Sequence, residues 1–372
     1  KGIPKLTSAE IPEKGETQAD VVIVGCGGSG IPAAVSAFEN GAGKVIIIEK
    51  QKRAGGNSVM ARGLFACESS VLRKAMVKSD KDEIFTNAMN WHHYFRVNGR
   101  ILRAWINQSG DTIEWLKKRG LEFEVGTTQR MTYDIDPHWH CVLKGTMAGP
   151  MGCLVAELQK RGAIFYTETQ VTEILMENGS VAGVLVKKDE TEFKIHAKSV
   201  VLASGGFLSN TELVKQYYPN FPEGGFGGYK APNMGESIAL AKTVGAKIDR
   251  DVMLIKEGCM TSDHAPRILS EFAREPYLIW VNKKGRRYVD ETVSSILQVA
   301  YNAQMTQPDM ESYVLFDEGT LHRMMDLGME LSKADNTRGV PIPDLKEKLE
   351  NARKAAPEEV MIADSIEEMA EW

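Results

Sequence analysis

Apolar residues near the start of the chain gather in two short uninterrupted runs, Val21–Val24 and Val45–Ile48. Runs of this length without polar alternation are typical of strands that are buried on both faces of a sheet. The alanine-rich stretch between the two runs has the composition of a helix. A strand, a helix and a second strand in close succession predict a βαβ unit over residues 20–50, with its two strands parallel.

In later segments the apolar residues recur at other spacings. Apolar residues recur at helical spacing over roughly residues 70–120, and a further helical stretch covers Met147–Arg161. Val171–Leu175 and Val181–Val186 alternate between apolar and polar residues around Asn178-Gly179, which predicts a β-hairpin. The remaining expected elements are a strand over Lys198–Ala203, a helix over Gly235–Gly245, and strands over Tyr277–Asn282 and Arg286–Val289 that precede further helices.

These patterns predict an arm and two domains. Residues 1–19 are polar with scattered Pro and Gly, and they are expected to form an N-terminal arm. Residues 20–250 carry the βαβ unit and the β-rich passage, and they are expected to form a dinucleotide-binding domain. Because the pattern changes after about residue 250, residues 251–372 are expected to form a separate domain, followed at its end by the start of a short helix.

The hexapeptide Gly25–Gly30, with the sequence GCGGSG, follows the first predicted strand directly and opens the predicted helix. In such a unit Gly25 permits the tight turn, Gly27 lets the backbone approach a pyrophosphate, and Gly30 lets the helix pack closely on the strand. Backbone N–H groups at the helix start favour negative charge. Glu49 follows about twenty residues later, where a carboxylate accepts from an adenosine ribose hydroxyl. The unit therefore predicts a site for an adenine dinucleotide.

Composition and charge exclude several classes of function. The 372 residues carry a net charge of −5 with both signs interspersed, which argues against binding to nucleic acid or an anionic membrane. No apolar run approaches the length of a membrane span. Five cysteines at irregular spacing predict free thiols rather than a disulfide framework or a metal site. Because the chain begins with Lys1, two compartments stay open: the cytoplasm, or the bacterial periplasm if a signal peptide was removed.

Six motifs in a fixed order give the chain a resemblance to a known family. They are GCGGSG with Glu49-Lys50, GGNS at 55–58, VVLASGGF at 200–207, NMGESIALAKTVGA at 233–246, VNKKGRRYVDE at 281–291 and ADSIEEMA at 363–370. This set resembles the flavoprotein subunit family of fumarate reductase and succinate dehydrogenase, which includes soluble enoate reductases and has 3-ketosteroid dehydrogenases as cousins. The resemblance implies an α/β fold, in which a Rossmann-like FAD-binding domain carries a smaller α+β capping domain.

The same resemblance assigns cofactor contacts to individual residues. It implies pyrophosphate contacts at Gly25, Gly27, Gly28, Ser29 and Gly30, and a ribose contact at Glu49 with Lys50 beside it. It further implies flavin contacts at Asn57, Ser58 and Gly63, a cofactor contact at Gly56, an adenine contact at the backbone of Val171, and a close approach at Gly205 and Gly206. It also implies a cofactor contact at Glu236, which stands where the family usually has Asp, and Ser237 stands where the family has Gly. Because no histidine lies in the GGNS region, the FAD is expected to be bound non-covalently.

The resemblance also implies where the chemistry lies. A flavin supplies hydride at its N5, and reduction of an enoate needs a proton donor as well. The family's Glu–Arg–Arg relay is matched by Glu271 and Arg274, but its terminal Arg position holds Ser295. The segment that grips substrate carboxylate in the family falls at Gly258 here. A surface salt bridge at i,i+3 is the structural alternative for the pair of Glu271 and Arg274.

These residues together predict an FAD-dependent oxidoreductase that reduces an activated C=C bond in an unsaturated small molecule less charged or bulkier than fumarate. Electrons are expected from an external donor, because the sequence has neither a haem CxxCH motif nor an iron–sulfur cysteine pattern. Two alternatives stay open: a dehydrogenase or oxidase of the ketosteroid-dehydrogenase kind, and an inactive flavin-binding fragment or electron relay. The abrupt end at Trp372 raises the second alternative, because it predicts that the C-terminal part of the flavin domain is missing.

Overall fold

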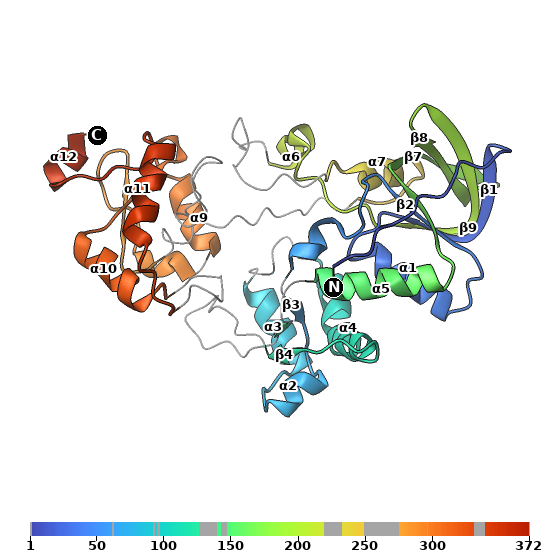
Figure 1. The fold of residues 1–372 in the computed structure, drawn as a ribbon, viewed down its shortest axis with the longest axis horizontal. Coiled ribbons are helices and arrows are strands. Elements are labelled where there is room, and N and C mark those ends of the chain that lie inside the picture. Colours follow the sequence, from blue (N-terminus) through green and yellow to red (C-terminus); the bar gives the residue numbers. More distant parts are fainter. Residues whose placement is uncertain are drawn as a thin grey trace. The chain divides into compact units, whose positions relative to one another are not determined.

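The structure is a computed structural model that describes residues 2–61, 63–91, 94, 97–125, 140–142, 147–218, 233–248, 275–295, 297–330 and 339–371. These residues fall into two compact units, the first holding those up to 248 and the second those from 275 on. The boundary predicted at residue 250 lies between the two, outside the described residues. Figure 1 shows the helices and strands of each unit.

A six-stranded sheet forms the centre of the first unit, in the order β6-β2-β1-β9-β8-β7. Its strands are β1 (Glu16–Val24), β2 (Val45–Glu49), β6 (Ile164–Thr167), β7 (Thr169–Glu177), β8 (Ser180–Lys188) and β9 (Thr191–Leu202). β6, β2, β1 and β9 run parallel to one another, whereas β9, β8 and β7 form an antiparallel meander. The α/β class predicted from the sequence is confirmed.

Helices cover both faces of this sheet. The helices of the unit are α1 (Gly30–Glu39), α2 (Ser70–Lys74), α3 (Lys81–Trp91), α4 (Gly99–Lys117), α5 (Ala148–Lys160), α6 (Thr211–Tyr217) and α7 (Glu236–Thr243), with the 3-10 turn η1 (Gly56–Met60). Ile23 and Ile47 pack with residues of α1 and α5, which lie side by side in Figure 1. Val22 and Ile46 point to the opposite cluster, which contains Leu240 of α7.

Burial on both faces explains the uninterrupted apolar runs of β1 and β2. Val22, Ile23, Ile46 and Ile47 are all 0% exposed. Burying one aliphatic side chain of this size contributes about 1.5–3 kcal/mol, so neither face of these strands tolerates a polar residue. The predicted βαβ unit is thereby held in a rigid position, and its loop is presented at the edge of the sheet.

The predicted hairpin is confirmed and is longer than the apolar alternation indicates. β7 and β8 pair in antiparallel register up to Glu177 and Ser180. Asn178 and Gly179 between them have φ angles of 50° and 76°. A type I′ turn requires positive φ at both central residues, which Asn-Gly adopts at low cost.

One sequence-based boundary is wrong. β1 begins at Glu16 rather than at Val21, because Glu16 and its successors pair with β9 from Lys194 onward. The end of the predicted N-terminal arm is therefore a strand. The helical character predicted over roughly 70–120 is confirmed, and the region consists of the three helices α2, α3 and α4. The side chains of Ser69 and Asn98 accept hydrogen bonds from backbone N–H groups of α2 and α4, and such caps start new helices.

A small second sheet in the first unit was not predicted. It pairs β3 (Gly63–Phe65), β5 (His140–Val142) and β4 (Glu124–Val125) in the order β3-β5-β4. Strands of two or three residues are too short to carry an alternation of polar and apolar residues that a sequence pattern could detect.

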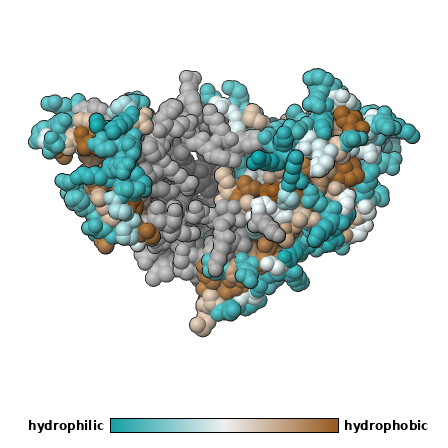
Figure 2. All heavy atoms as spheres, in the orientation of Figure 1, coloured by the Kyte–Doolittle hydropathy of each residue, from teal (hydrophilic) through white to brown (hydrophobic). Residues whose placement is uncertain are grey.

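The second unit packs helices on a two-stranded sheet. Its elements are β10 (Ile279–Asn282), η2 (Glu291–Ser295), α9 (Leu297–Met305), η3 (Pro308–Met310), β11 (Ser312–Leu315), α10 (Glu318–Leu327), α11 (Leu345–Ala355) and α12 (Ile366–Glu371). Leu278, Met324, Leu345 and Leu349 share one buried cluster. Hydrophilic side chains make up most of the visible surface around α11 (Figure 2). In the described ranges no helix has the length and apolar character of a bilayer span.

The strand predicted over Arg286–Val289 is not formed. β10 pairs along its full length with β11, and a single isolated bridge joins Val281 to Arg287. The turn between them is held by a side chain, since Asn282 Oδ1 accepts from the backbone N–H groups of Lys284 (2.9 Å) and Arg286 (3.2 Å). Side-chain bonds of this kind offer the backbone an alternative to a sheet ladder.

Candidate dinucleotide site

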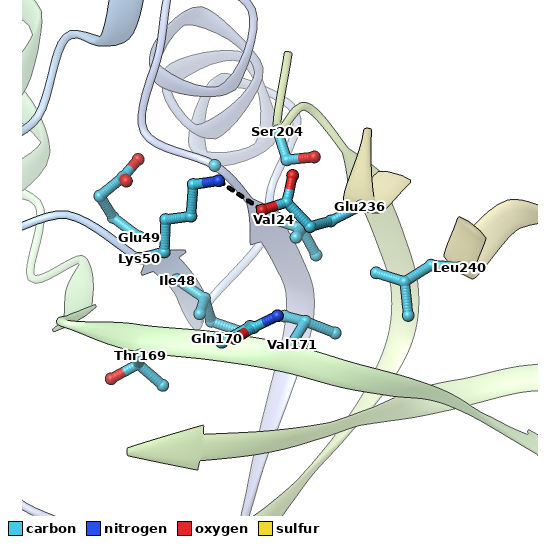
Figure 3. A pocket seen from close by; sticks show the side chains of 11 residues that line it. Val24, Ile48, Glu49, Lys50, Thr169, Gln170, Val171, Ser204, Glu236 and Leu240 are labelled. Carbon is cyan, nitrogen blue, oxygen red and sulfur yellow. Dashed lines mark hydrogen bonds and ion pairs between the residues drawn. The ribbon is translucent and has the colours of Figure 1, made fainter. Parts of the chain in front are cut away.

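The candidate site lies at the carboxyl edge of the parallel strands. β1, β2 and β9 run in the same direction, so the residues that follow them meet at one edge, where α/β sheets bind their ligands. A pocket at this edge is shown in Figure 3. Its lining residues are Val24, Gly25, Ile48, Glu49, Lys50, Thr169, Gln170, Val171, Ser204, Glu236 and Leu240.

Two glycines of the loop are required by the packing of the chain itself. Gly25 has a φ of +105°, and a Cβ there would collide with the backbone of Ala203 at the end of the neighbouring strand. A Cβ at Gly30 would collide with the carbonyl oxygen of Gly25, so a side chain would push α1 off the loop. The turn and close-packing roles predicted for these two glycines match the contacts found here.

Gly27, unlike Gly25 and Gly30, is not required by the packing of the chain. A Cβ at Gly27 would have no neighbour nearer than the Gly55 carbonyl oxygen at 4.0 Å, and its φ lies outside the left-handed region. The backbone N–H groups of Gly28 and Ser29 have no acceptor among the described residues, and the Ser29 side chain does not cap α1. Free space and unpaired N–H donors at a helix start fit a bound pyrophosphate, and nothing in the chain's own packing demands glycine at 27.

Glu49 braces the glycine loop. Its Oε2 accepts a hydrogen bond from the Cys26 backbone N–H (2.9 Å), and its Oε1 accepts from that of Gln51 (2.8 Å). Each carboxylate oxygen keeps capacity for a second donor, so the predicted bond to a ribose hydroxyl remains open to it. Burial, with a smaller effect of the Glu49 charge, raises the pKa of the Cys26 thiol to about 12. That thiol therefore stays protonated at neutral pH.

The GGNS segment lies against the glycine loop. The Gly55 N–H donates to the Cys26 carbonyl oxygen at 2.6 Å. The Ser58 side chain occupies the space beside Gly28, because a Cβ at that glycine would collide with the Ser58 hydroxyl. Gly56 and Asn57 are exposed in η1. These contacts bring residues 55–58 to the pyrophosphate side of the predicted site.

Two side-chain contacts fix the start of α7 at the pocket. Lys50 Nζ forms an ion pair with Glu236 Oε1, and the hydroxyls of Ser204 and Ser237 are hydrogen-bonded. Ser237 occupies a position where the resemblance expects glycine. The departure has a structural consequence, since a glycine could not make the contact to Ser204.

The predicted residues fall into three groups. Those that line the pocket are Gly25, Glu49, Lys50, Val171 and Glu236. Those beside it are the remaining loop residues, the GGNS segment, Gly205 and Gly206. The Gly206 carbonyl oxygen accepts a hydrogen bond from the Gly235 N–H at 3.1 Å, before the start of α7. Gly63 pairs with Val142 in the second sheet and is not part of the lining.

Other predictions lie outside the described residues, and some lining residues were missed. Glu271, Arg274 and Gly258 are outside the described residues, and Ser295 ends η2. Gln170 and Ser204 line the pocket but were not predicted. Ser204 lies two residues after the end of the parallel strand β9, a position that could have indicated it, whereas Gln170 lies within β7, three residues after β6 ends.

Comparisons with known proteins place the chain in a family. The model of the FAD binding domain matches residues 20–371. NADH:fumarate oxidoreductase of Klebsiella pneumoniae is 31% identical over 86% of this chain and 34% of its own length. Vinyl phenol reductase of Lactiplantibacillus plantarum is 27% identical over 94% of this chain and 72% of its own. The chain thus spans about a third of the first relative.

A solved structure supports the same fold. The open conformation of a flavocytochrome c3 fumarate reductase matches 92% of this chain and 62% of its own, with a TM-score of 0.67 at 23% identity. The family match covers nearly the whole chain, and the glycine loop supplies space and donors for a dinucleotide pyrophosphate. The chain therefore belongs to the FAD binding domain family, whose cofactor is FAD.

Proposed function

We propose that this chain binds FAD non-covalently and is an oxidoreductase that reduces an activated C=C bond in an unsaturated small molecule bulkier or less charged than fumarate. The observation that carries the cofactor part is the open space at Gly27, beside the unpaired N–H groups of Gly28 and Ser29. When bound, FAD supplies hydride chemistry at its N5. The chain's residues would hold and orient it.

Two observations support non-covalent binding. The GGNS segment, where membrane-bound members of the resembled family carry a flavin-linked histidine, contains none. Cys26 is the thiol of the glycine loop, and burial raises its pKa to about 12. A thiol that stays protonated is a poor nucleophile, so this side chain is not suited to forming a bond to the flavin.

The names of the two relatives and two departures from the family pattern support the substrate class. Fumarate and vinyl phenol each contain a C=C bond conjugated to a carbonyl or an aromatic ring, and each relative is named for acting on one of them. In this chain Ser295 replaces the terminal Arg of the relay, and Gly258 falls in the carboxylate-gripping segment. A site with fewer cationic groups favours a substrate with fewer carboxylates. The electrons are proposed to come from an external donor.

The cofactor part is tested by releasing the bound group. Acid precipitation of the purified protein is expected to leave a yellow supernatant whose solute has the mass of FAD, because no covalent bond retains it. Protein that stays colourless after incubation with added FAD would contradict the proposal. Yellow colour that remains in the precipitate would contradict only its non-covalent part.

The reaction is tested anaerobically with chemically reduced protein. Vinyl phenols and unsaturated monocarboxylates are expected to reoxidise the flavin faster than fumarate does. Fumarate as the fastest oxidant would overturn the substrate class. Reduction of the oxidised flavin by a saturated ketosteroid, with no reoxidation by any of these alkenes, would favour the dehydrogenase alternative.

Glu49→Ala is expected to weaken FAD binding by about 10- to 100-fold, since hydrogen bonds to a charged group contribute about 1.5–3 kcal/mol. The substitution removes the brace of the Cys26 and Gln51 amides together with the acceptor proposed for the ribose. Quenching of FAD fluorescence on binding measures the dissociation constant. Glu190→Ala, at a carboxylate that is 96% exposed and pairs with Lys187, is the control and should bind like the unaltered chain.

A further inference from the structure

Lys50 contacts Glu236 rather than standing free for the cofactor. Its Nζ reaches Oε1 of a residue 186 positions later in the chain, so the pair joins the end of β2 to the first residue of α7. The side chains are 26% and 22% exposed. Figure 3 shows the two side chains pointing toward each other across the pocket. An ion pair that is mostly shielded from solvent is screened less than a surface pair.

The second oxygen of Glu236 is the unusual feature. Oε2 is buried and has no hydrogen-bond partner in the described part of the chain. A buried carboxylate oxygen without a donor is costly and rare in folded proteins. Glu236 lines the pocket, and its carboxylate stands between Lys50 and Ser204 in Figure 3. The Ser204 hydroxyl is hydrogen-bonded to that of Ser237 and makes no bond to Oε2, so a ligand in the pocket can supply the missing donor.

We propose that Lys50 is a positioning residue, whose ion pair holds Glu236 so that Oε2 accepts a hydrogen bond from the adenosine half of FAD. The inference rests on the proposed function. It changes the role predicted for Lys50, which here positions a residue that contacts the cofactor and does not contact the cofactor itself. A carboxylate needs a donor, which ribose hydroxyls and the adenine amino group supply and phosphate oxygens do not. The apolar side chains of Val24, Ile48, Val171 and Leu240 around the pocket suit the flat adenine ring.

Charge supports the same assignment. Glu49 and Glu236 place two carboxylates in the pocket, and the ligand adds the negative charge of a pyrophosphate. Lys50 is the one cation among the described lining residues. Without it, no cation among the described lining residues would offset these like charges, and the Glu236 side chain could rotate away from the ligand. Loss of Lys50 should therefore weaken binding even if Lys50 never touches FAD.

The test compares four variants with the unaltered chain, using FAD and ADP as separate probes. ADP carries the adenosine half and no flavin. Lys50→Met and Glu236→Gln are each expected to weaken both ligands by about 10- to 100-fold. Lys50→Arg keeps the ion pair and should bind within about threefold of the unaltered chain. Binding is measured by titration calorimetry, and the urea midpoint of the apoprotein reports stability.

A variant in which Lys50 and Glu236 exchange their charges distinguishes a positioning role of the ion pair from a purely stabilising one. Lys50→Glu combined with Glu236→Lys re-forms an ion pair, but its carboxylate lies at the end of β2 instead of at α7. We expect the urea midpoint to recover toward that of the unaltered chain while FAD and ADP affinity stays low. Lys187→Met, which removes an exposed partner of Glu190, is the matched control and should change neither ligand's affinity.

Several results would overturn the inference. Recovery of affinity in the charge-exchanged chain would make the pair merely structural. Unchanged affinity in Lys50→Met would remove the positioning role, and weakened FAD with unchanged ADP would move the contact away from adenosine. Failure of the unaltered chain to bind FAD would overturn the proposed function, whereas all the other outcomes leave that function intact.

Discussion

Gly27→Ala is expected to leave the apoprotein as stable as the unaltered chain and to weaken FAD binding by about 10- to 100-fold, the cost of inserting a methyl group into a filled space. Without ligand, the added Cβ has no neighbour nearer than 4.0 Å and needs no unusual φ. With FAD bound, the methyl group would occupy the space proposed for the pyrophosphate. The urea midpoint of the apoprotein and the dissociation constant from fluorescence quenching measure the two effects separately.

Substitutions at two other glycines are the controls for this result. Gly25→Ala should lower the urea midpoint of the apoprotein, because its Cβ would collide with the Ala203 backbone at a φ of +105°. Gly99→Ala, at the first residue of α4, meets only ordinary contacts beginning at 3.6 Å and should bind FAD normally. Gly27→Ala with unchanged affinity would mean that the pyrophosphate does not pass this glycine, and a lowered midpoint would mean that the fold itself requires it.

The elements that could be predicted are those whose residues form a pattern over a short stretch of sequence. The βαβ unit is apparent because Val22, Ile23, Ile46 and Ile47 are buried on alternate faces, which leaves no polar position in either run. The hairpin is apparent because Asn178 and Gly179 tolerate positive φ. Both signals come from residues that are close together in the sequence.

The remainder depends on contacts that no local pattern encodes. Lys50 and Glu236 meet only because β2 and α7 converge at one sheet edge. The second role of Glu49, as a brace for backbone N–H groups, requires knowing how the glycine loop folds back. Arg286–Val289 has strand-like residues, yet the backbone N–H of Arg286 donates to the Asn282 side chain, and the Arg287 side chain donates to Glu291. In each case tertiary contacts override local preference.

Glu291→Ala is expected to lower the free energy of unfolding of the second unit by about 2–3 kcal/mol. Glu291 is 1% exposed, and its Oε1 accepts from the backbone N–H of Trp280 at 2.9 Å. Trp280 is equally buried, so its N–H would lose its acceptor in a position shielded from solvent. Urea denaturation followed by circular dichroism measures the loss. The VNKKGRRYVDE motif would then be shown to stabilise the fold, since Asn282 and Glu291 both bind backbone groups.

Arg287→Met is expected to destabilise the second unit in a pH-dependent way, because it removes the cation beside this buried carboxylate. Burial raises the pKa of Glu291, but hydrogen bonds from Arg287 and the Trp280 N–H outweigh it and hold the pKa below its usual value. In the unaltered chain the resulting stabilisation is therefore full above the unfolded pKa of about 4.3 and is lost as pH falls through the lower folded pKa.

Without Arg287 the effect of burial should dominate and raise the folded pKa of Glu291 above that of the unfolded chain. The variant's deficit should then be full above the raised pKa and shrink as the pH falls, because protonated Glu291 needs no cation. Urea midpoints between pH 8 and pH 4 test this against Arg286→Met, which changes a neighbouring exposed arginine in the same way. A deficit that is equal at every pH would mean that Arg287 acts by packing, and its charge would then have no part in holding Glu291.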